Sequence, residues 1–369
     1  MISEEMDWSV IWKRAQVDGH AVAMWRLPNQ SQQNLVADSS GGQLVDASEL
    51  EQLGTGFLAG PFIGQPYFLK ADVLWNKAPV QIDEAQLPYV ASVDNNSKKS
   101  AFIDQVADSI TQIQAGNFQK VVLSRIDEQD LASEFDLLRS FELLCYNYPH
   151  AFVAAIYIPA LGDIWLCATP ETLVSQDAQG IFRTISLAGT QSGLDASGNK
   201  LSPSEARWSQ KEIEEQAYVS RYIIDCFKRI RLREYHENGP KTVLAGNLMH
   251  LKTEYWVDTN RHHYPGLITQ MLNLLHPTSA VCGTPKEAAL DWILKTEQHA
   301  RSLYSGYLGP INLAHETHLF VNLRTVQLDG RIARYYAGCG ITEDSNPEKE
   351  WEETQMKCQT LQRVINASL

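Results

Sequence analysis

The sequence predicts an α/β protein of the α+β type, in which large, mixed but mainly antiparallel sheets pack in layers with helices outside. Strand-like runs follow one another instead of alternating strictly with helices, which favours this architecture over a doubly wound one. Asp329-Gly330 is a strong two-residue turn signal within HLFVNLRTVQLDGRIARYYAG, so this stretch is expected to form a β-hairpin. Several amphipathic stretches have the apolar spacing of helices that cover a sheet.

Composition and charge restrict the classes of partner. At 369 residues with 44% hydrophobic residues, the chain can bury a large core as one unit. A net charge of −13 argues against nucleic acid or an anionic membrane as a general partner, although one local site could still bind a small anion. The start MISEEMDWS lacks a signal-peptide pattern, and the 6 cysteines show no CxxC pair. We therefore expect reduced thiols and a cytoplasmic location.

The first third of the chain divides near residue 95. Residues 1–95 are rich in glycine, glutamine and proline, and we expect them to form an N-terminal, strand-rich part of the same fold. The polar tract 95–100 predicts a boundary or an exposed loop before the main domain, 96–369. An amphipathic helix over about 102–113 then stops at Gly116, and FQKVVLSR follows as an apolar strand that carries one lysine.

The remaining elements are expected in the following order. A helix covers about 134–146, and three strand-like runs, AFVAAIYI, DIWLCATPE and IFRTISLAGT, come next. A polar loop over 191–204 leads into a long acidic helix over about 204–234. The final third contains a strand near VLAGNLMHL, a helix near 266–275, and a turn-rich loop that enters a helix at Pro285, ahead of the hairpin.

Two helices carry pairs of carboxylates on their inward faces. Asn346-Pro347 is a helix start, and Glu350 and Glu353 then lie three residues apart on one face. That face continues through Lys357, Cys358, Leu361 and Ile365, which form an apolar stripe. These acids could simply complement the helix dipole in solvent. Buried, they would need a metal or another cation as a partner.

The long acidic helix repeats this arrangement. Glu212 and Glu215 share a face that continues through Val219, Ile223, Cys226 and Ile230. Two acidic pairs directed at one interior need a cation between them. Ligand sets made only of oxygen favour a hard ion, and we expect Mg²⁺ that keeps some waters and a substrate oxygen.

A series of short motifs resembles the chorismate-utilising enzymes over about residues 97–369. In chain order they are KVVLSR, ATPE, SLAGT, the segment 211–216, HPTSAVCGTPK, YSGYLG, VNLRT, AGCGI and EWEETQMK. That family includes isochorismate synthases, salicylate synthases and the synthase components that make anthranilate and aminodeoxychorismate. The resemblance implies the chorismate-binding, anthranilate synthase-like fold, with 96–369 as the catalytic domain.

The resemblance also implies roles for individual residues. Glu215 and Glu353 match Mg²⁺ ligands, and Glu212 and Glu350 would support them directly or through water. The other positions match substrate-binding groups: Arg324 and Tyr304 for the enolpyruvyl carboxylate, Lys357, Gly189 and Thr190 near the ring carboxylate, and His250, Ala280, Gly338 and Gly340 around them. Without the acidic helices beside them, Arg324 would read as a surface charge on a strand and Tyr304 as a core aromatic.

A few positions indicate the subgroup. Lys120 resembles a general base that activates water, and Glu171 resembles the general acid that protonates the departing C4 hydroxyl. Ala188 replaces the nucleophilic lysine of aminodeoxychorismate synthases, and Ala280 stands where pyruvate-eliminating relatives tend to have threonine. These positions imply an isochorismate synthase, an isomerase of the hydroxymutase type. A surface lysine whose stem lies along the strand is the simpler alternative for Lys120.

The implied substrate is chorismate, with Mg²⁺ as cofactor and menaquinone or siderophore biosynthesis as the pathway. We expect a monomer or weak homodimer, without a glutaminase subunit and without nucleic-acid or membrane partners. Two alternatives remain open. One is a salicylate synthase, which would go on to eliminate pyruvate, and the other is a non-catalytic chorismate-binding relative.

Overall fold

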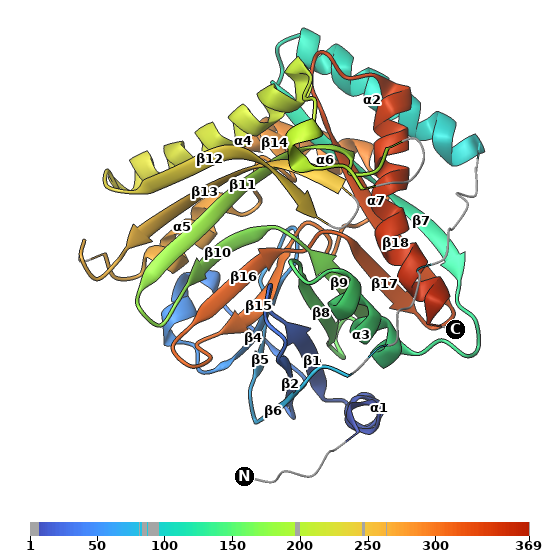
Figure 1. The fold of residues 1–369 in the computed structure, drawn as a ribbon, viewed down its shortest axis with the longest axis vertical. Helices are drawn as coiled ribbons and strands as arrows, with labels where there is room; N and C mark the ends of the chain where they lie inside the picture. Colours follow the sequence, from blue (N-terminus) through green and yellow to red (C-terminus); the bar gives the residue numbers. More distant parts are fainter. Residues whose placement is uncertain are drawn as a thin grey trace.

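The computed structural model describes residues 7–80, 82, 87, 96–195, 200–245, 248–262 and 264–368. Two nine-stranded sheets form its centre, and helices cover their outer sides (Figure 1). Every pairing between the described strands is antiparallel. The layered α+β architecture predicted from the sequence is therefore confirmed.

The first sheet has the order β14-β7-β18-β17-β9-β8-β1-β2-β6. Its strands are β1 (Ala21–Arg26), β2 (Gln33–Asp38), β6 (Val73–Lys77), β7 (Lys120–Asp130), β8 (Phe152–Tyr157), β9 (Ile164–Thr169), β14 (Gly283–Thr284), β17 (Thr325–Asp329) and β18 (Ile332–Ile341).

The second sheet has the order β12-β13-β11-β10-β16-β15-β4-β5-β3. Its strands are β3 (Gln43–Leu44), β4 (Gly56–Gly60), β5 (Tyr67–Lys70), β10 (Thr172–Gln176), β11 (Ile181–Ser192), β12 (His236–Ala245), β13 (Leu248–Asp258), β15 (Tyr307–Ile311) and β16 (Thr317–Val321). The helices are α1 (Trp8–Asp18), α2 (Asn96–Gln114), α3 (Leu137–Asn147), α4 (Gln210–Arg229), α5 (Leu267–Leu275), α6 (Lys286–Thr296) and α7 (Pro347–Ala367), with 3₁₀ turns η1 (Ala47–Gln52) and η2 (Pro203–Glu205).

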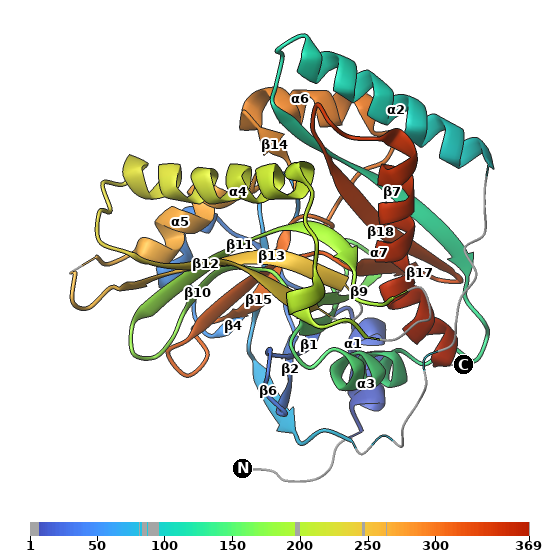
Figure 2. The same cartoon turned by 45° about the horizontal axis from the view of Figure 1, so that its top comes forward.

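Aromatic side chains join the central strands of the two sheets. Phe152 of β8 stacks on Phe320 of β16 with ring centroids 4.2 Å apart, and Trp25 of β1 meets Phe57 of β4 at 5.2 Å. Helices α1, α3 and α7 pack on the first sheet, and α4 and α5 pack on the second. Figure 2 shows α2 and α6 beside β7 and β18, where a further apolar cluster joins them. Burial on both sides of each sheet places the core in these layers.

The strands of residues 21–77 are divided between both sheets. β1, β2 and β6 belong to the first sheet, and β3, β4 and β5 belong to the second. The expected boundary near residue 95 lies outside the described residues. Within the polar tract predicted as a boundary or loop, residues 97–100 are helical. They belong to the first turns of α2, where polar side chains can face solvent. There Lys98 pairs with Glu128 at 3.0 Å, and Lys99 pairs with Glu348 at 3.6 Å.

Four other features differ from what the sequence predicts. VLAGNLMHL is divided between β12 and β13, and Thr172–Gln176 forms an additional strand, β10. The predicted hairpin is confirmed for β17 and β18, where the Asp329–Ile332 pair leaves residues 330–331 as the loop. HLFV, in contrast, belongs to β16 of the other sheet. The acidic helix is shorter than expected, because Ser209 and Glu212 form a capping box that starts α4.

The helices predicted near 266–275 and after Pro285 are confirmed as α5 and α6. All six cysteines are free thiols, and all except Cys145 are buried. None of the helices in the described part of the chain is long and apolar enough to cross a membrane.

Candidate active site

One pocket collects almost all of the site residues predicted from the sequence. Elements of both sheets line it, together with residues of α4 and α7. The predicted residues in its wall are Lys120, Glu171, Gly189, Thr190, Glu215, His250, Ala280, Tyr304, Arg324, Gly338, Gly340, Glu353 and Lys357. Glu212 and Glu350 lie outside this lining. Residues that are far apart in the sequence thus form one site.

Lys120 is directed into the pocket by the alternation of β7. Val121 and Leu123 belong to the apolar cluster beneath α2 and α6, so Lys120 and Val122 point to the opposite face. The Lys120 residue is 2% exposed. Its side chain therefore lies in the pocket wall and not on the molecular surface, which excludes the alternative of a surface lysine.

Glu171 lies in the short connection between β9 and β10. Its backbone carbonyl accepts a hydrogen bond from Val321 N at 2.9 Å, and its own N–H donates to Thr169 Oγ1 at 3.4 Å. Pro170 precedes it and also lines the pocket. The Glu171 residue is 3% exposed, so these backbone contacts hold a buried carboxyl group at the pocket wall.

Burial gives Lys120 and Glu171 opposite protonation tendencies. It lowers the pKa of Lys120, against the attraction of Glu215, because the charged ammonium loses its hydration. It raises the pKa of Glu171 to about 8, although Lys120, Lys357 and Arg324 oppose this shift. The lysine is thereby biased towards the neutral amine and the glutamate towards the protonated acid, which suits them to act as a base and an acid.

Two glycines of β18 allow groups to approach the pocket floor. Tyr336, Gly338 and Gly340 alternate along the strand and all line the pocket. A Cβ at Gly338 would stand 2.8 Å from the Tyr304 hydroxyl, and one at Gly340 would stand 2.1 Å from Glu215 Oε1. Any side chain at these positions would displace its neighbours. The glycines thus make space for Tyr304 and Glu215.

Arg324 is a buried cation in the pocket wall. It lies between β16 and β17 with φ 47°, and the residue is 9% exposed. Its guanidinium contacts Thr360 Oγ1 at 3.4 Å and His250 Nε2 at 3.3 Å, and it forms no ion pair with any acid in the described part of the chain. Burial lowers its pKa. A buried guanidinium in this state favours an anionic ligand with two oxygens.

His250 of β13 links Arg324 to the backbone of β11. His250 Nδ1 lies 2.8 Å from the carbonyl oxygen of Gly189. Because a carbonyl can only accept, Nδ1 carries the proton, and Nε2 is free to accept from Arg324. Burial and the adjacent guanidinium lower the pKa of His250 to about 3. The imidazole is therefore neutral and orients Arg324 towards the pocket.

Three carboxylates gather where α4 and α7 meet the pocket. Glu215 comes from α4, and Glu350 and Glu353 come from α7. Lys211 Nζ lies 2.5 Å from Glu350 Oε1, and Lys357 Nζ lies 2.6 Å from Glu353 Oε1. Burial works to lower the pKa of Lys211, but the three carboxylates together outweigh it and raise that pKa. The lysine ammonium groups thus balance part of the acidic charge.

The carboxylate cluster has the donor chemistry that a hard cation needs. Burial raises the pKa of Glu215, and burial together with Glu353 raises that of Glu350 to about 7. Glu350 Oε2 is buried and has no hydrogen-bond partner among the described residues. No group of three or more acidic, histidine or cysteine side chains in the described ranges is already arranged as a metal site. The oxygen donors, the excess acid and the unpartnered oxygen nevertheless fit Mg²⁺.

Glu212 has a different environment from the other acids. Its Oε2 accepts from Ser209 N at 2.7 Å and also from the Ser209 hydroxyl. Its Cβ lies beside Gly189, where an added side chain would meet it at 3.0 Å. Glu212 therefore caps α4 and packs against β11, and it does not face the pocket with Glu215.

The sequence analysis missed several contributing residues. Lys211 was not singled out, although it precedes Glu215 by one helical turn and so shares its face. Tyr336 lines the pocket and stacks on Tyr304, with ring centroids 5.3 Å apart. The alternation that includes Gly338 and Gly340 could have identified it. Val122 and Leu187 belong to the apolar lining, but nothing in their local sequence distinguishes them from core residues.

The chain is similar to known proteins over most of its length. Residues 70–366 match the sequence model of the family described as chorismate binding enzyme. Isochorismate synthase EntC of Escherichia coli (strain K12) is 30% identical over 276 residues, which cover 73% of this chain and 68% of that protein. Isochorismate synthase MenF of Bacillus subtilis (strain 168) is 26% identical over 281 residues, which cover 75% of this chain. The matched region spans 57% of that MenF.

The fold is also similar to a solved structure. The crystal structure of DhbC from Bacillus anthracis matches with a TM-score of 0.80 and 21% sequence identity, and the match covers 97% of this chain and 100% of that chain. At this level of identity, the similarity establishes the architecture.

Proposed function

The chain belongs to the chorismate-binding enzymes, and from this premise we propose that it converts chorismate to isochorismate. Water is added at C2 and the C4 hydroxyl is lost, while the enolpyruvyl ether stays intact. The observation that carries the proposal is the pair formed by Lys120 and Glu171 in one pocket. Burial biases the lysine towards its neutral form and the glutamate towards its protonated form. One group can therefore accept a proton while the other donates one.

The reaction balances with these two side chains. The neutral amine of Lys120 takes a proton from water as the water oxygen bonds to C2. The two ring double bonds then shift, and the C4–oxygen bond breaks as Glu171 gives its proton to the leaving hydroxyl. One water enters and one water leaves, so chorismate and isochorismate are isomers. Proton exchange with solvent returns Lys120 and Glu171 to their starting forms.

Substrate orientation is assigned to the cations of the pocket. Arg324 offers two parallel N–H donors to the enolpyruvyl carboxylate, and the neutral His250 keeps that fork in place. Tyr304 approaches the same region across Gly338. Lys357 and Thr190 also line the pocket and suit the ring carboxylate. Such positioning can contribute as much to the rate as the acid and base do.

We assign a Mg²⁺ site to Glu215 and Glu353, with Glu350 in support. When bound, the ion would supply positive charge to the ring carboxylate. The chain's own part is to hold the acids in place: α4 and α7 carry them, and Lys211 and Lys357 balance their charge. Glu212, whose carboxylate caps α4, supports the helix that carries Glu215.

Water as the nucleophile makes an ammonia-supplying glutaminase subunit unnecessary, and we expect a monomer or a weak homodimer. Six free thiols suit a reducing compartment such as the cytoplasm. The chain matches one relative named isochorismate synthase MenF and another named isochorismate synthase EntC. We therefore propose menaquinone or siderophore biosynthesis as the pathway, to be assigned from the genes beside this one.

The direct test is to incubate the purified protein with chorismate and MgCl₂ and to identify the product by NMR. Pyruvate release is followed in the same samples with lactate dehydrogenase. We expect isochorismate without pyruvate. Ala280 stands where pyruvate-eliminating relatives tend to have threonine, and Ala188 replaces the nucleophilic lysine of aminodeoxychorismate synthases. Salicylate with an equal amount of pyruvate would instead establish a salicylate synthase. An unchanged substrate would indicate a non-catalytic binding protein.

A further inference from the structure

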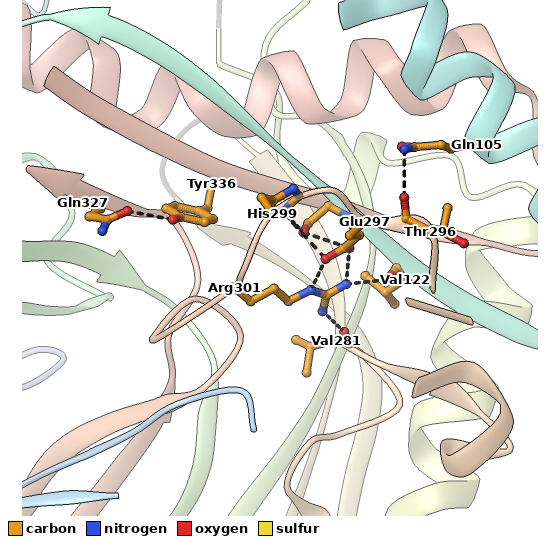
Figure 3. A network of polar contacts seen from close by, with 10 residues as sticks. Gln105, Val122, Val281, Thr296, Glu297, His299, Arg301, Gln327 and Tyr336 are labelled. Atoms are coloured by element: carbon orange, nitrogen blue, oxygen red, sulfur yellow. Dashed lines mark hydrogen bonds and ion pairs between the residues drawn. The ribbon is translucent and has the colours of Figure 1, made fainter. Parts of the chain in front are cut away.

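A buried ion pair lies behind the pocket wall, in the segment that follows α6. Figure 3 shows Glu297 and Arg301 in contact, with the side chain of His299 beside them. The two charged side chains are 3% and 2% exposed. Neither residue lines the substrate pocket. The proposed reaction does not use this ion pair directly, so its burial calls for another explanation.

Four hydrogen bonds hold the guanidinium of Arg301. Nε donates to Glu297 Oε2 at 2.9 Å, and Nη2 donates to Glu297 Oε1 at 2.6 Å. The other contacts go to backbone oxygens, with Nη1 to Val281 O and Nη2 to Val122 O, each at 2.7 Å. The ring of Phe62 packs against the guanidinium, 4.3 Å from its Cζ. The planar group is therefore fixed in one orientation.

The ion pair continues the hydrogen-bond ladder of β7 beyond the short strand β14. β14 pairs with Lys120 and Val121, and Val122 N donates to Cys282 O at 2.8 Å. Past that point, Val122 O accepts from Arg301, and Ser124 N donates to Glu297 Oε1 at 2.6 Å. The side chains of Glu297 and Arg301 thus take the place of a neighbouring strand along this edge.

Three parts of the pocket wall meet at this pair. Val122 is two residues from Lys120 and points to the same face of β7. Val281 follows Ala280, and both residues line the pocket. Tyr304 N donates to the backbone carbonyl of Arg301 at 2.9 Å. A shift of the guanidinium would therefore move the strand of the general base and the Ala280 wall relative to one another.

We propose that Glu297 and Arg301 are positioning residues for the reaction, holding Lys120 and the Ala280–Val281 wall at a fixed separation. The proposal rests on the proposed function, because it concerns the alignment of the base with chorismate. A buried ion pair adds little stability over apolar side chains of the same volume, whereas its bonding directions are specific. Misplacing a catalytic group by about 1 Å can cost on the order of 10²-fold in rate.

Arg301→Lys tests the proposal, with Arg26→Lys as the matched control. The lysine keeps the charge but cannot donate to Glu297, Val122 and Val281 with one planar group. Arg26 is also buried, at 2% exposed, and donates to the backbone carbonyls of Leu27, Cys145, Tyr148, Pro149 and Ala151. None of these residues lines the substrate pocket. Both variants are assayed below their melting temperatures.

We expect Arg301→Lys to lower kcat for chorismate by at least about tenfold while KM changes by less than about threefold. Arg26→Lys should lower the melting temperature and leave kcat unchanged. An Arg301→Lys protein that loses only stability, like the control, would overturn the proposal. If Arg301→Lys does not fold, Glu297→Gln, which keeps the shape of the carboxylate, is measured against the same expectations.

Hydrogen exchange separates this inference from the proposed function. In Arg301→Lys, peptides covering 118–125 and 276–285 should exchange faster, while peptides in α5 and β13 keep their wild-type protection. If the wild-type protein left chorismate unchanged, the proposed function would fail and these exchange rates would still test the strand-holding role. Wild-type protection of both segments in the variant would refute that role.

Discussion

The carboxylate of Glu215 occupies the space in which a side chain on residue 340 would lie. A Cβ at Gly340 would stand 2.1 Å from Glu215 Oε1 and 3.0 Å from Cε of Lys120. A group from α4 and a group from β7 therefore meet over a backbone position without a side chain. The proposed general base and the proposed metal ligand both depend on this glycine.

Gly340→Ala should abolish turnover while the protein stays folded. The added methyl group has to displace Glu215, Lys120 or both, because contacts below about 3 Å are not tolerated. We expect kcat to fall by more than about 100-fold, in line with the loss of a positioned base. Steady-state assays and thermal unfolding measure the two effects separately.

Gly54→Ala serves as the control for this substitution, because an added Cβ there meets nothing within 4 Å. It should have wild-type activity. Turnover by Gly340→Ala at more than about a tenth of the wild-type rate would contradict the close packing of the base and the acid.

The pH dependence of kcat/KM should be bell-shaped. Activity needs neutral Lys120, so it is lost as pH falls through the lowered pKa of that lysine. Activity also needs protonated Glu171, so it is lost as pH rises through about 8. Lys120→Gln should remove the acidic limb and Glu171→Gln the alkaline limb, each with a loss of about 10²–10⁴-fold in rate. Rate profiles from pH 5 to 10 check both limbs, and a variant that keeps both limbs would exclude its residue from the proton transfers.

Mg²⁺ binding should depend on both acidic helices. Glu215→Gln and Glu353→Gln each remove one charged ligand, so calorimetric titration with MgCl₂ should show at least about tenfold weaker binding. Glu348→Gln is the control, because Glu348 lies on the first turn of α7 with its side chain 61% exposed. Chelation of Mg²⁺ should stop turnover by the wild-type protein. Full activity in excess chelator would show that turnover does not require Mg²⁺.

Arg324→Lys should weaken substrate binding more than it slows the chemistry. Lysine keeps the positive charge but loses the fork that matches a carboxylate. We expect KM for chorismate to rise by about 10-fold or more, which corresponds to about 1.4 kcal/mol. Arg334→Lys, at a partly exposed arginine that pairs with Glu128 and Asp329, is the matched control. Equal KM values for the two variants would argue against a carboxylate at Arg324.

Part of the pocket could be predicted from short-range patterns. Strand alternation places Gly338 and Gly340 on one face, and helical spacing places Glu350, Glu353 and Lys357 together. These patterns follow from the side-chain repeat of a strand or a helix. That repeat relates residues that are close together in the sequence. The motifs that carry the resemblance then identified positions on separate elements that no local pattern could bring together.

The long-range features could not be predicted in this way. HLFV belongs to a different sheet from the hairpin that follows it, because strand pairing is decided by tertiary packing. Glu297 and Arg301 have the spacing of an ordinary surface ion pair, and only their 3% and 2% exposure reveals their position behind the pocket wall. Glu212 shares a helical face with Glu215, but its carboxylate bonds to Ser209 in the capping box and does not line the pocket.

Water labelled with oxygen-18 tests the water-addition mechanism most directly. The purified protein is incubated with chorismate and MgCl₂ in the labelled water, and the earliest product is analysed by mass spectrometry. If Lys120 activates water for attack at C2, every isochorismate molecule should carry one heavy oxygen, located in its C2 hydroxyl. Isochorismate without the label would show that the original C4 oxygen had moved within the substrate, and would contradict the role of Lys120 as the base that activates water.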